Sequence, residues 1–397
     1  MRLAVSLTPM LFPFVLAAQQ PVTRADAVAA ALARGARVAL GRADTTAALG
    51  AARAARAFPN PTVSGTYSKD TPNYHALGDL PLDLPWLRSP RIGAAESARD
   101  AARYRFAFER AAIRFDVDTT YSRTLSAALL ARLSRRTALD ADSLLRIAEL
   151  RRDVGDVSEL DVRLAAVNAG QLANTAADDS LAALEKLLSL QLQMGLTGDQ
   201  PAIVLVDSLR PPPDSAPTEG RVLLPIAAAE ASLRSAERSL AFASRSRFAP
   251  TVQFGFDTGD PTSATPHQLL PVVGFSLPFP LFNFGHGDVL RASAERDRAR
   301  AQLDLTRRES EAAVARARRD LLAARDRLRR TGALVESANR VATMSIQAYS
   351  EGAVPLATVL EAQRNAREIL ARYINDLATA DAATRALKML TAAPDEP

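Results

Sequence analysis

The chain has 397 residues, of which 48% are hydrophobic and only 5% aromatic, and its formal net charge is +5 at pH 7. It contains no cysteine, which excludes a thiolate metal site, a catalytic thiol, a disulfide framework and a lipid anchor on an N-terminal cysteine. Arginines alternate with acids in stretches such as residues 295–311, the pattern of a solvated helix face, so the basic balance does not indicate nucleic acid. Alanine supplies much of the hydrophobic fraction, which favours long, closely packed helices.

Residues 1–18 have the layout of a signal peptide. Arg2 is followed by an apolar run, residues 3–16, and then by Ala17 and Ala18, near which we expect cleavage. A buried N-terminal helix is the alternative. No other stretch approaches the roughly 18–20 continuous apolar residues of a membrane-spanning helix. We therefore expect an exported protein, in which any membrane crossing uses strands.

The mature chain consists of two related halves. Pro-Thr-Val occurs at Pro61 and again at Pro250, and a turn at Gly155 recurs at Gly352. Two landmarks in the same order and at nearly the same separation indicate a tandem duplication. We expect a first repeat at residues 19–208, a proline-rich linker at 209–220, a second repeat at 221–391 and a C-terminal tail at 392–397.

Each repeat is predicted to contain a helix, two short strands and two long helices, in that order. The long helices follow from the absence of proline between Pro90 and Pro201 and between Pro280 and Pro355. In the second stretch, apolar residues step by three and four positions, which is coiled-coil spacing, with a lapse at Thr331. The first helices are predicted at about 23–57 and 223–247, the strands at 62–68, 79–86, 250–257 and 270–281, and the long helices at 92–153, 158–195, 288–350 and 355–391.

Apolar residues occupy every second position of the predicted strands, and small or polar residues occupy the others. This pattern fits a half-buried soluble sheet, or a membrane strand with lipid on one side and water on the other. The second interpretation requires several chains, because four strands cannot close a barrel alone and an open edge is not tolerated in lipid. The residues expected to face lipid are Val252, Phe254, Phe256, Phe275, Leu277, Phe279 and Leu281, and Gly285 and Gly287 are expected to turn the chain from strand into helix.

The run FSLPFPLFNFG at residues 275–285, which leads into an arginine-rich helix, resembles the strand-to-helix junction of the TolC-type outer-membrane efflux proteins. Residues 351–390 are similar to the family's tip turn and closing helix, and the branch resembled serves heavy-metal and multidrug pumps. The resemblance spans the mature chain. It implies a fold of α-helices and transmembrane β-strands: a homotrimer in which four strands per chain form one shared β-barrel, and long helical hairpins form a helical barrel through the periplasm.

The resemblance also implies a function, the outer-membrane exit duct of a tripartite efflux system. Such a duct passively conducts substrate received from an inner-membrane pump, here expected to be of RND type, and a periplasmic adaptor protein. In the family the adaptor docks at the helical tips, which correspond here to Val154, Gly155, Asp156, Gly352 and Ala353. A glycine at these places can also be an ordinary helix-ending residue, and both roles can hold together.

Acidic residues that narrow the entrance in the family correspond to Asp161, Thr358 and Glu361, of which Thr358 departs from the pattern. An ordinary exposed helix carboxylate is the alternative for the two acids. We expect no enzyme, no metal site and no cofactor, because no nucleophile–base set is apparent and His75, His267 and His286 are not at ligand spacing. An exported soluble coiled-coil scaffold without a pore is the alternative to the duct.

Overall fold

The computed structural model describes residues 20–213, 223–246, 249–259, 268–278, 282 and 284–392. The predicted signal peptide, most of the linker, His267, Phe279, Leu281 and nearly all of the C-terminal tail lie outside these residues. The chain divides into two compact units. The tip unit comprises residues up to Gly35, Ile113–Asp214 and Leu321–Arg385, and the strand unit comprises Ala36–Ala112, Ser215–Asp320 and Ala386–Pro397.

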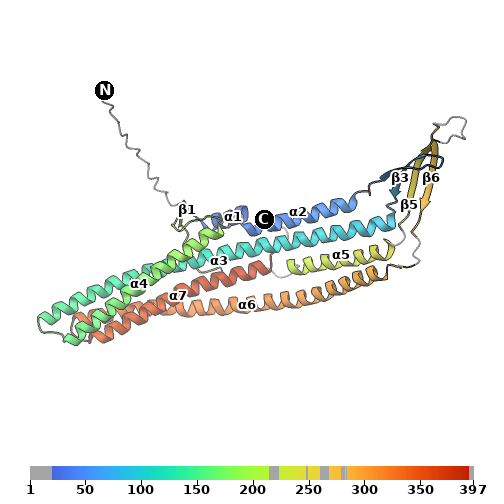
Figure 1. Ribbon diagram of the computed structural model, residues 1–397. Helices are drawn as coiled ribbons and strands as arrows, with labels where there is room; N and C mark the ends of the chain where they lie inside the picture. The colour runs from blue at the N-terminus through green and yellow to red at the C-terminus, as the bar shows by residue number, and fades with distance from the viewer. Residues whose placement is uncertain are drawn as a thin grey trace, which may run out of the picture. The chain divides into compact units, whose positions relative to one another are not determined.

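Four strands form one antiparallel sheet in the strand unit (Figure 1). Strand β2 (Thr62–Tyr67) pairs with β3 (Tyr74–Pro81), β3 pairs with β5 (Thr251–Thr258), and β5 pairs with β6 (Leu270–Ser276). Each predicted repeat therefore contains one hairpin, and the two hairpins join through β3 and β5. Strands β2 and β6 are the edges of the sheet among the described residues.

The second predicted strand, residues 79–86, is wrong beyond Pro81. Strand β3 ends there, and helix α3 (Pro85–Asp153) begins four residues later. Alternating leucine and proline imitates the period of a strand, but proline has no N–H for the ladder and suits the first turn of a helix. The strand starts instead at Tyr74, within a stretch expected to be a loop.

The last strand is also shorter than predicted, because β6 ends at Ser276 rather than at residue 281. Leu277 follows the strand, so its prediction as a strand residue is wrong, although its side chain is exposed. Pro278 explains the end of the ladder, since a proline cannot donate to a neighbouring strand.

The strand unit also contains four helical segments, which extend away from one end of the sheet (Figure 1). They are α2 (Ala36–Arg56), the first part of α3, α5 (Leu224–Ser246) and the first part of α6 (His286–Ser350). Arg105 on α3 donates to Ser232 on α5 at 2.8 Å, which holds these two helices side by side. The single helix predicted at about 23–57 is divided at Gly35, where the backbone is extended, into α1 (Arg24–Arg34) and α2.

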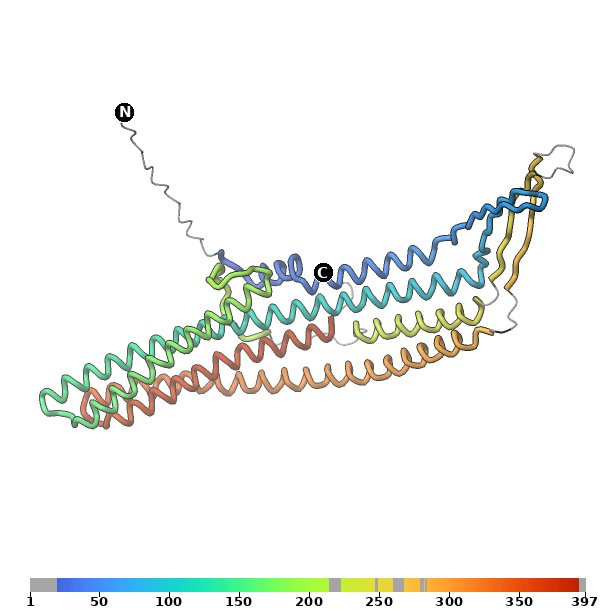
Figure 2. The backbone as a smooth tube through the Cα atoms, viewed as in Figure 1, coloured from blue at the N-terminus to red at the C-terminus, as the bar shows by residue number. Residues whose placement is uncertain are grey.

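The tip unit contains two antiparallel helical hairpins, the second part of α3 with α4 (Glu159–Gln193) and the second part of α6 with α7 (Leu356–Leu390), which lie side by side in Figure 2. Small and branched residues form the seams, with Ala324 and Leu328 of α6 against Leu377 and Ala380 of α7. Alanine at these positions lets the helix axes approach closely. A two-stranded parallel sheet of β1 (Gln20–Val22) and β4 (Ile203–Leu205), which we did not predict, joins the same unit.

The lapse in the coiled-coil pattern at Thr331 is a buried polar contact. Thr331 Oγ1 donates to the Asp376 carboxylate at 2.7 Å, across the seam between α6 and α7. The first hairpin has the same contact between Ser134 and Asp179. Ser134 precedes Thr331, and Asp179 precedes Asp376, by the same number of positions. This number is also the separation of Gly155 and Gly352. The two hairpins thus carry one polar pair at equivalent places, as a duplicated unit would.

Candidate functional site

The two helical tips turn on glycines in the left-handed conformation. Gly155 has φ +80° and Gly352 has φ +74°. At the first tip the N–H of Asp156 donates to Arg151 O at 2.8 Å, and the N–H of Gly155 donates to Arg152 O at 2.8 Å. This pair of bonds is the Schellman motif, which satisfies the last carbonyls of a helix. The second tip repeats it, with Ala353 N–H on Ala348 O and Gly352 N–H on Tyr349 O.

The glycines therefore end α3 and α6 in the ordinary way, and they also leave short exposed turns. Val154 is 78% exposed, an unusual state for valine, and the neighbouring tip residues Gly155, Asp156, Gly352 and Ala353 are exposed as well. A Cβ atom added at Gly155 would contact nothing, because no neighbouring atom of the described structure lies within 4 Å of its position. The first tip consequently offers an accessible apolar side chain on a turn of fixed shape.

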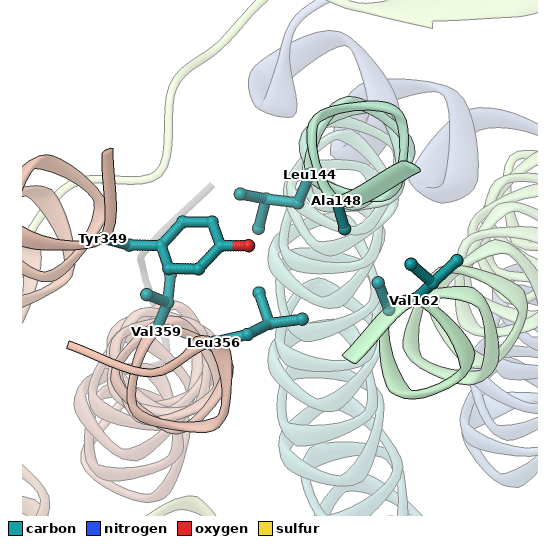
Figure 3. Packing of buried hydrophobic residues seen from close by; sticks show 7 residues of the cluster. Leu144, Ala148, Val162, Tyr349, Leu356 and Val359 are labelled. Carbon is teal, nitrogen blue, oxygen red and sulfur yellow. The ribbon is translucent and has the colours of Figure 1, made fainter. Parts of the chain in front are cut away.

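A buried cluster holds the four helices together just behind the tips (Figure 3). Tyr349 of α6, only 4% exposed, packs beside Val359 of α7, and its hydroxyl points toward the side chains of Leu144 of α3 and Leu356 of α7. That hydroxyl has no hydrogen-bond partner among the described residues. The cluster comprises Leu144, Ala148, Val162, Ala165, Tyr349, Leu356 and Val359.

One arginine ties the two tips to each other, and sequence reasoning missed it. Arg151 Nη1 donates to Tyr349 O at 2.9 Å, and its guanidinium lies 4.7 Å from the centre of the Tyr349 ring. Arg151 also binds the Asp156 carboxylate, with Nε at 2.7 Å. The hydrogen bond to Asp156 raises the pKa of Arg151, which keeps the guanidinium charged. Because the contact joins two hairpins, no local pattern in the sequence could reveal it.

The three predicted constriction residues have different surroundings. Asp161 is the third residue of α4, and its carboxylate accepts from Ser158 N at 3.2 Å in a reciprocal capping box. Thr358 is an exposed residue in the first turn of α7. Glu361, also exposed, pairs with Arg364 at 2.7 Å. Within one chain, Asp161 and Glu361 belong to different hairpins, and each already has a hydrogen-bonding or ionic partner.

The sheet has one apolar face. Val252 is paired with Leu80 and Phe275, and Phe254 with Val273. Paired residues point to the same side of a sheet, so these side chains share a face. The face is open: Val273 is 82% and Phe275 64% exposed. The residues on it with exposed side chains are Val63, Tyr67, Tyr74, Leu80, Phe254, Phe256, Val273 and Phe275.

The opposite face of the sheet carries most of the polar side chains, together with Leu77, Leu270 and Val272. His75 Nδ1 lies 2.9 Å from the Asp257 carboxylate, and these two residues are directly paired across β3 and β5. Four residues further along the same pair of strands, Gln253 donates to Asp79 at 2.8 Å. A sheet with one apolar face and one face of hydrogen-bonded polar side chains suits a boundary between an apolar medium and water.

The turn from sheet into helix uses Gly285 but does not need Gly287. Gly285 has φ +69° and immediately precedes α6, whereas Gly287 lies inside the first turn of that helix at an ordinary φ. Across the described ranges, no helix is long and apolar enough to cross a membrane. In the same residues, no three His, Asp or Glu side chains are grouped so that they could hold a metal ion.

Comparison with known proteins identifies the class. The model of the family described as outer membrane efflux protein matches residues 224–393. A membrane protein from Pseudomonas aeruginosa has a TM-score of 0.77, at 20% identity over 93% of each chain. The outer membrane protein VceC from Vibrio cholerae has a TM-score of 0.75, at 18% identity over 93% of this chain and 95% of that one. The fold is therefore that of the TolC-type channels.

The chain is similar to the outer membrane efflux protein family over residues 224–393, which is less than half of its length. It is similar to the cobalt-zinc-cadmium resistance protein CzcC of Cupriavidus metallidurans, with 27% identity over 252 residues. That alignment covers 62% of this chain and 60% of the relative, so it spans less than two thirds of the relative's length. The family consists of channel proteins rather than enzymes, and its members lie in the outer membrane and extend into the periplasm.

Proposed function

We propose that this protein is the outer-membrane exit duct of a tripartite efflux system, which passively conducts substrate handed over by an inner-membrane pump and a periplasmic adaptor. The observation that carries the proposal is the sheet with one exposed apolar face and one polar face, in a chain with the fold of outer-membrane channels. The apolar face contacts lipid, and the polar face lines water.

The edges of the sheet require an assembly of several copies in lipid. In lipid, an unpaired strand edge leaves N–H and C=O groups without partners, each at a cost of several kcal/mol. Strands β2 and β6 are edges in a single chain. Pairing β6 of one copy with β2 of the next removes both edges and closes a barrel shared by three chains, the number that the family resemblance implies.

The helical tips are the docking surface for the adaptor in this proposal. Val154 projects from a turn whose backbone is set by Gly155, and Gly352 and Ala353 form the matching turn of the second hairpin. An exposed valine on a rigid turn can enter a small apolar pocket with little loss of entropy. The sequence resemblance favours an RND-type pump behind that adaptor.

We infer that the cargo is cationic, because the relative's name connects it with cobalt, zinc and cadmium resistance and the polar face of the sheet carries carboxylates. In a threefold assembly, one inward carboxylate becomes a ring of three, which attracts cations and repels anions. Glu361 is the better candidate for such a ring at the entrance, since Asp161 is engaged as a helix cap.

The ring hypothesis is tested by Glu361→Gln in the reconstituted channel. We expect a lower ratio of cation to anion permeability, measured from the reversal potential in a salt gradient. Arg364→Gln is the matched control, because it frees the Glu361 carboxylate from its partner and should raise that ratio. Unchanged reversal potentials in both variants would remove Glu361 from the entrance.

A further inference from the structure

A pocket of about 640 Å³ lies in the strand unit beside the place where the strands give way to helices. Its walls come from the start of α3 and the end of α5, including Arg88 and Ser89 on one side and Arg238 and Arg245 on the other. Strand β3 ends four residues before α3 begins, so the pocket adjoins the rim of the sheet.

Two charges of the pocket are already neutralised. Arg88 pairs with Asp83 at 2.9 Å, and the Asp83 side chain is only 2% exposed. Glu96, the acidic residue of the lining, pairs with Arg56.

The other two arginines donate only to neutral groups. Arg238 donates to Gly93 O at 2.9 Å, and Arg245 lies 3.4 Å from Trp86 O. Across the described residues, neither forms an ion pair with a carboxylate. Two guanidinium groups with unused N–H donors therefore face one hollow. A guanidinium presents its donors in a planar fork that matches phosphate oxygens.

Gly93 of α3 allows Arg238 of α5 to lie close to the α3 backbone. A Cβ atom at Gly93 would lie 2.6 Å from Arg238 Nη1, so glycine at this position lets the guanidinium lie directly against α3. Gly93 has no positive φ, and the glycine is explained by this close approach rather than by a turn.

Exposed aromatic rings stand next to the charged pocket. Trp86, in the first turn of α3, is 51% exposed, and Phe58 is exposed beneath the Arg88 guanidinium, 4.0 Å from ring centre to carbon. Tryptophan collects where lipid tails meet water, because its ring is amphipathic. Basic and aromatic side chains together match the headgroup layer of a membrane.

We propose that this pocket binds the phosphate of an anionic phospholipid headgroup at the periplasmic surface of the outer membrane. The inference rests on the proposed function, which places the strands in lipid and so puts the pocket at the level of the headgroups. Arg238 and Arg245 hold the phosphate, and Trp86 packs against the upper acyl chain. Each arginine is expected to contribute about a fivefold preference for an anionic over a zwitterionic lipid.

Trp86 is the only tryptophan of the chain, so its fluorescence reports on this pocket alone. The full-length protein is reconstituted in vesicles that contain phosphatidylcholine and phosphatidylglycerol in equal amounts, with bromine on the chains of one lipid or of the other. We expect brominated phosphatidylglycerol to quench Trp86 several-fold more effectively than brominated phosphatidylcholine. Equal quenching by the two lipids would overturn the site.

Three variants assign the preference to the two arginines. Arg245→Gln should reduce the preference about fivefold, and Arg238→Gln combined with Arg245→Gln should abolish it. The Arg245→Gln variant should not disturb the packing of the helices. Among the described residues, the Arg245 side chain forms one hydrogen bond, a long one of 3.4 Å to Trp86 O. Arg234→Gln, which removes the same charge from an exposed position of α5, is the control and should keep the preference. A preference that survives in the double variant would contradict the proposal.

Two further arms separate the possible causes of failure. Inorganic phosphate in excess, at constant ionic strength, should leave the lipid preference intact; its loss would reassign the pocket to free phosphate. Conductance of the same vesicles tests the duct by itself. A protein that conducts without a lipid preference refutes only the pocket, whereas a protein that neither conducts nor shows quenching by either lipid refutes the membrane location on which both proposals rest.

Discussion

Tyr349 shows how single residues set the stability of the tip. Its ring fills the cluster between four helices, while its buried hydroxyl has no partner among the described residues. Burying an unpaired hydroxyl costs about 1–3 kcal/mol, whereas truncating a buried aromatic ring costs about 3–5 kcal/mol. Ring and hydroxyl therefore contribute to stability with opposite signs.

We predict that Tyr349→Phe leaves the free energy of unfolding unchanged or raises it by about 1 kcal/mol, and that Tyr349→Ala lowers it by about 3–5 kcal/mol. Urea denaturation in detergent measures both. A loss of stability in Tyr349→Phe as large as that of the alanine variant would show that the hydroxyl, and not the ring, carries the contact.

Asp161 is expected to act on stability rather than on ion flow. Its carboxylate accepts from the Ser158 backbone, so Asp161→Ala should destabilise the start of α4 by about 1 kcal/mol. Ser158→Ala removes the other half of the capping box and should cost a similar amount. Hydrogen exchange of the first turn of α4 reads out both. An Asp161 variant with altered permeability and unaltered exchange would restore Asp161 to the entrance.

Tyr121 makes the tip unit sensitive to alkaline pH. Burial, followed by the neighbouring Asp207 carboxylate, raises the pKa of Tyr121 from 10.0 to about 12, and its hydroxyl donates to Val22 O at 3.0 Å. The raised pKa means that the folded state holds the proton more tightly than the unfolded state does. The stabilisation is complete below pH 10 and is lost as pH rises through about 12.

We predict that the free energy of unfolding falls between pH 10 and 12 by a smaller amount in Tyr121→Phe than in the unaltered protein. The phenylalanine variant starts from a lower value, because it lacks the bond to Val22. Tyr104→Phe, on the same helix, keeps Tyr121 and should keep the full loss. Identical alkaline slopes in all three proteins would contradict the assignment.

The sequence could predict some of these roles and not others. Ser158 followed by Asp161 is the ordinary sequence signature of a capping box at a helix start. The family resemblance instead assigned Asp161 to the constriction at the entrance. The tip glycines and the alternating residues of β5 followed from local chemistry. The tie between Arg151 and Tyr349 could not be predicted, because it joins residues from two hairpins whose packing is not written in either segment.

At the scale of elements, the long hairpins are aligned by polar contacts as well as by apolar seams. Thr331 on Asp376 and Ser134 on Asp179 fix one register in each hairpin, because a shifted helix would leave a carboxylate buried without its partner. The spacing of apolar residues predicted the seams, but it showed Thr331 only as an interruption of the apolar pattern and not as a polar contact. The end of β3 was misplaced for a related reason, since the Leu-Pro alternation carries the period of a strand without its hydrogen-bond donors.

The central pair of strands depends on close backbone contact at Gly255. A Cβ atom there would lie 2.2 Å from Ala76 O, so Gly255→Ala must push β3 and β5 apart. We predict a destabilisation of about 1–3 kcal/mol and loss of assembled protein in membrane extracts. Gly65→Ala in the edge strand β2 is the control, because its new methyl group would lie 3.9 Å from the nearest atom. Equal tolerance of both changes would contradict the described pairing of β3 with β5.

At the scale of the whole molecule, one chain is incomplete in two respects. Its sheet has an open apolar face and two unpaired edges among the described residues; in the proposed assembly, lipid covers the face and further copies pair with the edges. Sequence reasoning reached this requirement from the alternation of the strands, and the fold of the outer-membrane channels agrees with it. A soluble scaffold without a pore would have to cover the same surfaces in some other way.

Conductance across planar lipid bilayers measures directly whether this chain forms a membrane duct. The full-length protein, purified from outer-membrane extracts, should migrate as a heat-resistant trimer and should insert to give discrete conductance steps of uniform size. Gly255→Ala should lower the number of insertions, and Gly65→Ala should not. A monomeric protein that leaves the bilayer silent at every concentration would contradict the central claim that this chain forms a membrane duct.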